Sequence, residues 1–207
     1  EHWQYQLPAV ENTPCGDTLR DVRGEEGLQA LILSDGMGTG AAAALDSAML
    51  CNLVGRLLEA GIPCGSALRL VNSALMVKGG RETLATLDAA AVDCYTGSAA
   101  FYKAGAAPTF LRRQGRAMRL EAVSLPAGIL DGVEPVKRRF ALREEDLLLM
   151  VSDGVPTEEP WVEEQLTAWE GDDPAELCRR IAEAARLRCR ETRPDDITVA
   201  ALRLVRQ

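Results

Sequence analysis

The chain has 207 residues and a formal net charge of −8, from 23 Lys and Arg against 31 Asp and Glu. Its 47% of hydrophobic and 26% of charged residues are close to the averages of soluble globular proteins, and no apolar run approaches the roughly 20 residues that span a bilayer. The acidic balance repels nucleic-acid backbones and anionic lipid surfaces. We therefore expect no nucleic-acid partner and no membrane contact from this segment.

Cysteine and histidine usage narrows the chemistry further. Six cysteines occur without a C-x-x-C pair, which argues against a structural zinc site or a disulfide scaffold and indicates reduced thiols. The single histidine, His2, lies near an end that we expect to fray, so Ser-His-Asp and Cys-His chemistries are close to excluded. Catalysis must then depend on carboxylates, backbone groups and metal ions.

The chain begins at Glu1 and shows no signal-peptide core. We expect a cytoplasmic fragment of a longer protein, whose upstream segment is a candidate membrane anchor. Because no repeat and no linker divides the sequence, residues 1–207 are predicted to form a single domain.

The first half of the sequence predicts a hairpin followed by two helices. The loop Gly24–Gly27 carries two glycines between two strand-length runs, as is typical of a hairpin. The first helix is predicted from apolar residues at helical spacing and a terminal glycine. These apolar residues are Leu45, Met49, Leu53 and Leu57, with Gly61 as the stop. The predicted elements are strands 18–23 and 28–34 and helices of about 39–60 and 65–77.

The second half changes to a strand pattern. Strands 84–93, 98–103, 109–113 and 117–120 are predicted to form an antiparallel meander, and 136–142 and 146–152 another hairpin. Asp173 is the expected N-cap of a helix that starts at Pro174 and ends near Cys189, and 197–205 is the last strand. Strands in hairpins with paired helices between them favour an α+β sandwich over a doubly wound parallel sheet.

Two apolar strands end in the same tripeptide, Ser-Asp-Gly, which contains Asp35 in the first and Asp153 in the second. A carboxylate that directly follows a buried strand loses hydration, a cost of several kcal/mol that a cation or hydrogen bonds must offset. The neighbouring glycine allows close approach of backbone to a ligand.

Strand pairing brings two further acids toward these. If the loop pairs Arg23 with Leu28, paired residue numbers sum to 51, and Asp17 then faces Ser34 beside Asp35. Asp195 precedes the last strand, and would meet Asp153 if the two strands pair antiparallel.

Four carboxylates without histidine form an oxygen-rich set that suits Mg²⁺ or Mn²⁺. Two such ions about 3.5–4 Å apart could activate a water and clamp a phosphoryl group. The alternative is that each Ser-Asp-Gly is an ordinary turn, and for any one acid the two interpretations carry equal weight.

An ordered set of motifs runs through nearly the whole chain. The motifs are Cys15-Gly16-Asp17, Asp35-Gly36-Met37-Gly38-x-Gly40, Thr83 to Asp88, Ala104 to Pro108, Leu125-Pro126-Ala127-Gly128-Ile129, Asp146 through Ser152-Asp153-Gly154, and Asp195-Asp196-Ile197-Thr198. In this order they resemble the metal-dependent protein phosphatase (protein phosphatase 2C, PPM) family, most of all the phosphatase domain of stage II sporulation protein E. The resemblance implies a four-layer α/β/β/α sandwich of two antiparallel sheets flanked by helices.

The resemblance also implies a binuclear Mn²⁺ or Mg²⁺ centre. By position, Asp35 would bridge both ions, Gly36 would offer its carbonyl oxygen, and Asp17 would hold one ion. Asp153 and Asp195 would hold the other, so that Asp35 and Asp153 are the expected catalytic residues. Asp196 stands where many relatives have Asn, and is expected to support the ligands rather than bind an ion.

Met37 stands where eukaryotic members have a histidine thought to protonate the leaving group. The general acid is therefore unassigned, with a metal-bound water as the candidate. A dinucleotide-binding interpretation of the Gly36 to Gly40 loop is disfavoured, because its spacing is not G-x-G-x-x-G.

Two other charged features have structural explanations. Asp88 falls opposite Lys103 in the predicted meander, which favours a cross-strand ion pair over a catalytic role. The remaining basic cluster is predicted to be a solvated helix face, with contact to an acidic partner protein as the alternative. Its members are Arg179, Arg180, Arg186, Arg188, Arg190 and Arg193.

The leading hypothesis is a hydrolase: a Mn²⁺- or Mg²⁺-dependent serine/threonine protein phosphatase that uses metal-activated water. The resemblance implies a phosphoserine on an anti-anti-sigma-type protein as substrate, and sigma-factor regulation in sporulation as context. The alternatives are a catalytically weak or inactive phosphoprotein-binding module of the same fold, or a small-molecule phosphoesterase.

Three glycines join Asp35 to the first helix. Gly36, Gly38 and Gly40 are a candidate hinge, and the resemblance implies that the following helix pair is a switch coupled to formation of a homodimer. The alternative is a pair of ordinary core helices with a glycine-rich entry loop.

Overall fold

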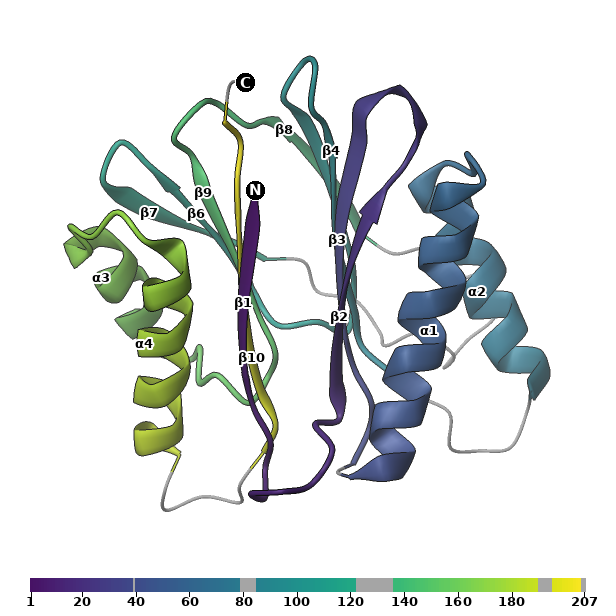
Figure 1. The fold of residues 1–207 in the computed structure, drawn as a ribbon, viewed down its shortest axis with the longest axis horizontal. Coiled ribbons are helices and arrows are strands. Elements are labelled where there is room, and N and C mark those ends of the chain that lie inside the picture. Colours follow the sequence, from purple (N-terminus) through teal and green to yellow (C-terminus); the bar gives the residue numbers. More distant parts are fainter. Residues whose placement is uncertain (39, 79–84, 122–135, 190–194, 206–207) are drawn as a thin grey trace. The chain divides into compact units, whose positions relative to one another are not determined.

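The computed structural model describes residues 1–38, 40–78, 85–121, 136–189 and 195–205, which form ten strands and four α-helices (Figure 1). They belong to two compact units. Unit 1 consists of Glu1–Cys15, Ala107–Glu121 and Arg143–Gln207, and unit 2 of Gly16–Ala106 and Ala122–Leu142. Each unit contains one five-stranded antiparallel sheet with two helices.

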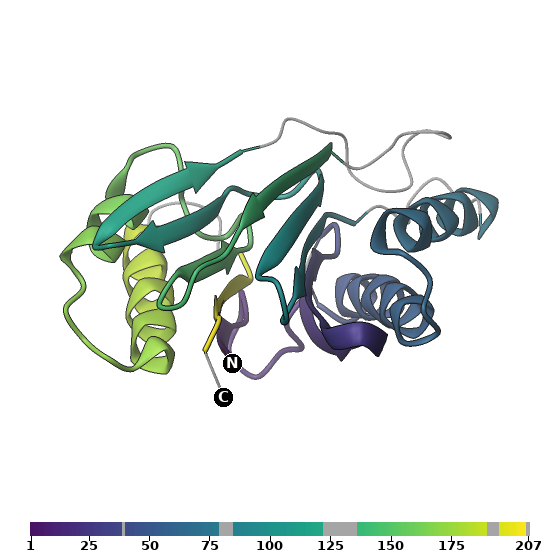
Figure 2. The same cartoon turned by 90° about the horizontal axis from the view of Figure 1, so that it is seen from above.

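Unit 2 holds the sheet with strand order β2-β3-β4-β5-β8. Its strands are β2 (Asp17–Arg23), β3 (Leu28–Asp35), β4 (Leu87–Asp93), β5 (Ser98–Ala104) and β8 (Val136–Ala141). Helices α1 (Ala41–Glu59) and α2 (Cys64–Lys78) cover one face of this sheet, as the view from above in Figure 2 shows. The predicted hairpin and both predicted helices are thus confirmed.

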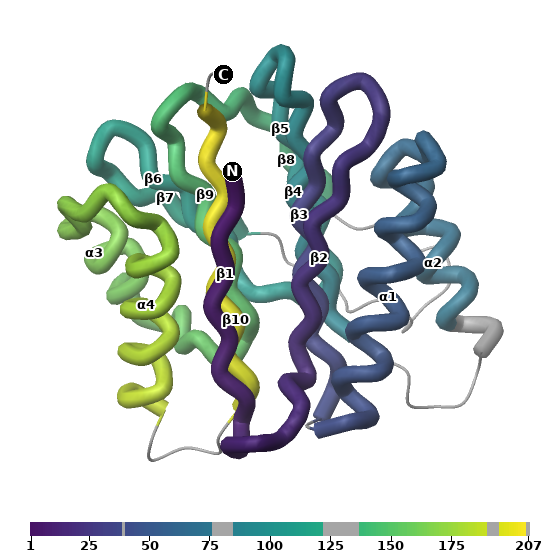
Figure 3. Tube along the Cα trace, in the orientation of Figure 1, coloured from purple at the N-terminus to yellow at the C-terminus, as the bar shows by residue number. Residues whose placement is uncertain are grey.

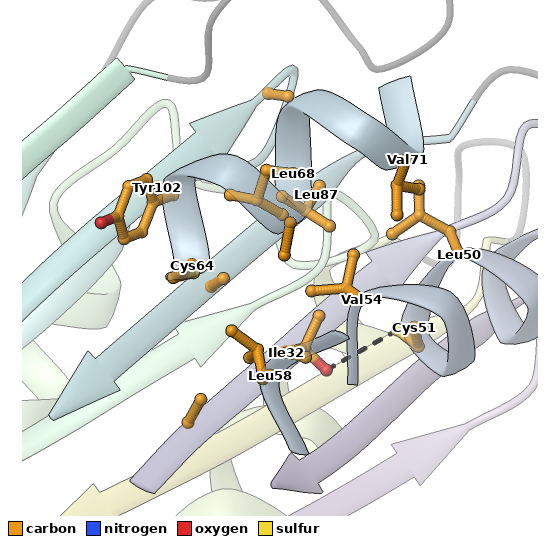
Figure 4. Close-up of a cluster of buried hydrophobic side chains, with 14 of the residues drawn as sticks. Ile32, Leu50, Cys51, Val54, Leu58, Cys64, Leu68, Val71, Leu87 and Tyr102 are labelled. Carbon is orange, nitrogen blue, oxygen red and sulfur yellow. Dashed lines mark hydrogen bonds between the residues drawn. The ribbon is translucent and has the colours of Figure 1, made fainter. Parts of the chain in front are cut away.

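The core of unit 2 lies between these helices and the sheet, and Figure 4 shows its apolar side chains. Helix α1 contributes Leu50, Cys51, Val54 and Leu58, all fully buried. The thiol of Cys51 donates to the carbonyl oxygen of Ile32 on β3 at 3.8 Å.

The apolar stripe that predicted this helix lies only partly on its buried face. Met49 and Leu57 pack against the core, whereas Leu45 is 67% exposed and Leu53 is 41% exposed. The fully buried residues form a neighbouring stripe, and α1 also contacts β2. Ser47 Oγ lies 2.8 Å from Thr18 Oγ1, and Arg20 donates to Asn52 at 2.6 Å. Periodicity predicted the helix but not its orientation.

Unit 1 holds the sheet with order β1-β10-β9-β6-β7 (Figure 3). Its strands are β1 (His2–Leu7), β6 (Thr109–Arg113), β7 (Arg116–Leu120), β9 (Leu147–Val151) and β10 (Ile197–Arg203). Helices α3 (Trp161–Ala168) and α4 (Pro174–Arg188) pack on one face. Asp173 caps α4 as predicted, since its side chain accepts a hydrogen bond from the Ala175 N–H at 2.9 Å.

The N-terminal residues form a strand, so the expectation that they fray is wrong. Strand β1 pairs antiparallel with β10, with His2 opposite Leu202. The terminal amino group of Glu1 donates to the Arg203 carbonyl at 3.0 Å. The alternation of Trp3, Tyr5 and Leu7, which pack against the core of unit 1, was the sequence signal for this strand.

The predicted meander is confirmed only as two hairpins, β4–β5 and β6–β7, and the predicted second hairpin is wrong, because the chain changes sheet after β5 and after β8. Strand β5 pairs with β4 and β8, whereas β6 pairs with β7 and β9. The connection after β8 shows why β9 does not fold back on it. The carboxylate of Asp146 accepts from the Arg143 N–H at 2.7 Å and from Arg113 of β6 at 2.6 Å, whereas the Leu142 N–H donates to Gly97 beside β5.

The predicted ion pair between Asp88 and Lys103 is confirmed, and it is buried. The two residues are opposite each other on β4 and β5, with Lys103 Nζ 2.5 Å from Asp88 Oδ2. Both side chains are at most 3% exposed. Removal of one partner from such a pair leaves an uncompensated buried charge.

We expect Lys103→Met to lower the free energy of unfolding by about 3–5 kcal/mol, because Asp88 loses its counter-charge. The double variant Asp88→Leu/Lys103→Met removes both charges and should lose less than the sum of the two single variants. Urea unfolding of the four proteins checks this. Additive losses would contradict a coupled buried pair.

Candidate metal site

The register of β2 on β3 places Asp17 directly opposite Asp35. The Gly24 N–H donates to the Leu28 carbonyl at 2.8 Å, so the loop between the strands has three residues, Glu25–Gly27. Glu26 (φ 54°) and Gly27 (φ 77°) both adopt left-handed backbone conformations there.

Paired residue numbers therefore sum to 52, and the predicted sum of 51 is wrong by one residue. The predicted four-residue loop would have placed Asp17 opposite Ser34. The observed register makes the neighbourhood of the two acids closer than predicted, since directly opposed residues point to the same face of a sheet.

The Asp17–Asp35 pair combines like charges with burial. Asp17 is 4% exposed, and Asp35 is half-buried at the end of β3. Like charges directly opposite on neighbouring strands destabilise a sheet, and a divalent cation between carboxylate oxygens offsets that repulsion. The oxygen donors present here fit a hard cation such as Mg²⁺ or Mn²⁺.

Gly36 directly follows this pair and passes close to the first turn of α1. A Cβ atom at position 36 would lie 2.1 Å from the Ala43 carbonyl oxygen, so only glycine fits. The next two glycines are required for another reason, because Gly38 (φ 95°) and Gly40 (φ 82°) have left-handed backbone conformations. Met37, between Gly36 and Gly38, is 60% exposed.

Thr86, which sequence reasoning did not single out, holds the backbone of Asp35. Its Oγ1 accepts from the Asp35 N–H at 3.1 Å, and its own N–H donates to the Asp35 carbonyl at 2.8 Å. The Ser34 hydroxyl donates to the Thr86 carbonyl at 2.8 Å. The sequence signal was the position of Thr86 directly before the strand that pairs with β3.

The second pair of acids lies in unit 1, where β9 pairs antiparallel with β10, which is the condition for their predicted proximity. Val151 is opposite Val199, and the Ser152 N–H donates to the Thr198 carbonyl at 3.0 Å. The end of β9 therefore lies beside the start of β10, which brings Asp153 and Asp195 to the same edge of the sheet. Both of these residues are exposed.

The contact between the two strand ends is close. A Cβ atom at Gly154 would lie 2.0 Å from the Asp196 carbonyl oxygen, so Ser-Asp-Gly here needs its glycine.

Asp196 is buried and binds the chain near the N-terminus. Its Oδ1 accepts from the Ala9 N–H at 2.7 Å, and its own N–H donates to Asp195 Oδ1 at 2.9 Å. Arg186 donates to the carbonyls of residues 7–9, so this member of the predicted solvated face has a structural contact. Arg179 does lie on an exposed face and pairs with Glu183, while positions 190 and 193 fall outside the described residues.

Each unit thus supplies one pair of the four predicted carboxylates. Among the residues that the structure describes, no three His, Cys, Asp or Glu side chains form a group that could hold a metal ion. The metal-binding and supporting roles of the site residues remain predictions. These residues are Asp17, Asp35, Gly36, Asp153, Asp195 and Asp196.

Comparison with known proteins identifies the family of the chain. The family model described as stage II sporulation protein E (SpoIIE) matches residues 25–205. Stage II sporulation protein E of Priestia megaterium is 31% identical over 196 residues, which cover 91% of this chain and 34% of that protein. The protein of the same name from Bacillus subtilis (strain 168) is 33% identical over 183 residues, covering 84% and 22%. The chain thus spans about a third or less of the length of these curated relatives.

A solved structure extends the likeness to the fold. The PP2C phosphatase domain of SpoIIE from Bacillus subtilis, solved with a fragment of its regulatory domain, is 27% identical, with a TM-score of 0.85. The match covers 98% of this chain and 63% of that one. Together with the two antiparallel sheets and their helices, this confirms the predicted α+β sandwich. The chain belongs to the stage II sporulation protein E family and is a PP2C-type phosphatase domain.

Proposed function

We propose that this domain removes phosphate from serine or threonine of a protein substrate with the aid of two divalent ions, Mn²⁺ or Mg²⁺. The observation that carries the proposal is the direct opposition of Asp17, which is buried at the start of β2, and Asp35, at the end of β3. Membership of a PP2C-type phosphatase family supports the same chemistry, since that family implies dependence on divalent metal.

The chain's own residues would hold the ions. Asp17 and the Gly36 carbonyl oxygen would be ligands of one ion, Asp153 and Asp195 would be ligands of the other, and Asp35 would be a ligand of both. When bound, such ions lower the pKa of a coordinated water and neutralise charge on a transferring phosphoryl group. Asp196, through its contacts with Ala9 and Asp195, would fix the start of β10.

The finer assignments follow from the family resemblance. We propose a phosphorylated anti-anti-sigma-type protein as substrate, sporulation as context, and a cytoplasmic location. Among the described residues, α1 alone is long and apolar enough to cross a membrane, with a mean hydropathy of 1.3. Its fully buried residues Leu50, Val54 and Leu58 in the core of unit 2 account for much of that apolar character.

The hinge remains part of the proposal. The left-handed conformations of Gly38 and Gly40 and the close approach of Gly36 to Ala43 connect the position of Asp35 to that of α1. A rotation of α1 would then move the carboxylate of Asp35, and the homodimer implied by the resemblance is the proposed cause of such a rotation.

Thiol chemistry is disfavoured for three of the six cysteines by their burial. Burial raises the pKa of Cys51, Cys64 and Cys178 to about 12 in each case. The nucleophile in thiol catalysis is the thiolate, which these residues do not form near neutral pH. Cys94 is exposed, but it directly follows the last residue of β4, whereas Leu87 is the first residue of that strand and Thr86 directly precedes it.

We expect calorimetry to detect Mn²⁺ binding by the wild-type chain, and Mn²⁺ to raise its melting temperature, because the ion offsets the Asp17–Asp35 repulsion. Asp35→Asn should abolish the thermal shift without lowering the metal-free melting temperature. Release of phosphate from an aryl phosphate and from a phosphoserine protein should fall about 100-fold or more, since an ion supplies several kcal/mol to the transition state.

The matched control is Asp21→Asn, on the same strand and the same face as Asp17. It should leave both Mn²⁺ binding and turnover unchanged. Mn²⁺ binding without turnover on either substrate would favour the phosphoprotein-binding module. Turnover of the aryl phosphate alone would favour a small-molecule phosphoesterase, and the absence of Mn²⁺ binding would contradict the whole proposal.

We expect Cys94 to react first with a thiol reagent at pH 8 in the native protein, and Cys51, Cys64 and Cys178 to react only after unfolding. Burial and a pKa of about 12 explain the protection of these three. Thiol titration with and without guanidinium checks the order. Loss of phosphatase activity on alkylation of Cys94 would point to a thiol mechanism instead.

A further inference from the structure

We propose that Thr86 is a positioning residue for Asp35, and that its hydroxyl group sets the affinity for the metal ion. This inference rests on the proposed function, in which Asp35 is a metal ligand. It comes from three hydrogen bonds between the end of β3 and the residue that precedes β4.

The pairing of Asp35 with Thr86 departs from a regular ladder. Residues that form a hydrogen-bonded antiparallel pair exchange both backbone bonds. Here the Thr86 N–H donates to the Asp35 carbonyl as expected, but the Asp35 N–H donates to Thr86 Oγ1. The Thr86 carbonyl accepts instead from the hydroxyl of Ser34. Two side-chain hydroxyls therefore replace one backbone bond.

This replacement occurs at Asp35, whose side chain must be placed correctly to bind the proposed metal ion. The regular β3–β4 ladder ends with Leu33 opposite Asp88, and one residue past Asp35 the chain forms an isolated bridge between Gly36 and Ala85. Thr86 binds both backbone groups of Asp35, so it fixes the direction in which the Asp35 side chain leaves the strand. Asp17 lies opposite Asp35 on the other neighbouring strand, β2, where its carboxylate would share an ion with that of Asp35.

A purely structural role predicts a different outcome from a positioning role. If Thr86 only closes the end of the sheet, its loss lowers stability and leaves metal affinity alone. If it orients Asp35, its loss weakens metal binding while saturating metal restores much of the turnover, because the ion itself then reorders the ligand.

The test compares Thr86→Val with Thr86→Ser in the 207-residue chain. Valine keeps the shape but removes the acceptor, and we expect the Kd for Mn²⁺, measured by calorimetry, to rise about tenfold, the equivalent of one lost hydrogen bond. Serine keeps the hydroxyl and should return the Kd to within about twofold of wild type. In metal-free protein, the Asp35 amide should exchange its hydrogen faster in Thr86→Val and not in Thr86→Ser.

The control is Thr96→Val at the other end of β4, where a threonine Oγ1 also accepts a backbone N–H, that of Ser98 at 3.2 Å. It should leave both the Kd and the Asp35 amide unchanged. A wild-type Kd in Thr86→Val, or an unchanged Asp35 amide, overturns this inference and leaves the proposed function standing. Absence of Mn²⁺ binding by the wild-type chain overturns the proposed function and this inference together.

Discussion

The turn at Glu25–Gly27 is the constraint on which the candidate site depends. A shift of one residue in strand pairing moves every side chain of a strand to the opposite face. The three-residue loop, with left-handed Glu26 and Gly27, fixes β2 on β3 so that Asp17 and Asp35 share one position across the sheet. On the same face, Leu19 is opposite Leu33. Leu33 is in turn opposite Asp88 on β4, which forms the buried pair with Lys103 on β5. A longer or shorter loop would separate the acids.

Backbone contacts then hold the acidic end of β3 from two directions. Thr86 forms hydrogen bonds with the backbone of Asp35, and Gly36 allows the chain to pass close to Ala43 at the start of α1. The same helix is tied to the neighbouring strand where Ser47 meets Thr18, the residue after Asp17. Both acids of the pair are therefore connected to α1 through their immediate neighbours, and a displacement of that helix would reach both.

Local sequence patterns predicted most elements, whereas pairing depended on contacts that a pattern does not contain. Asp173 and Pro174 marked the start of α4, and the spacing around the Cys94 turn predicted the Asp88–Lys103 pair. The connection between β8 and β9 includes contacts of Asp146 with Arg143 and Arg113 that no local pattern contains, and α3 has only eight residues, too few for a clear period. For the site, the Ser-Asp-Gly repeats singled out Asp35 and Asp153 as candidate acids, but the loop geometry decided that Asp17 faces Asp35.

The pairing of β1 with β10 has a consequence for how the chain acquires its structure. His2 and Leu202 are neighbours in the folded sheet, although they lie 200 positions apart along the chain. Contacts between residues so distant along the chain cost loop-closure entropy before they return any stabilisation, and they slow folding. Four of the five strands of unit 2 and both of its helices are complete by residue 104. During synthesis this unit can therefore assemble before β10, the strand that pairs with β1, has been made. The half that contains Asp17 and Asp35 is thus the one expected to fold early, and the half that contains Asp153 and Asp195 the one that finishes last.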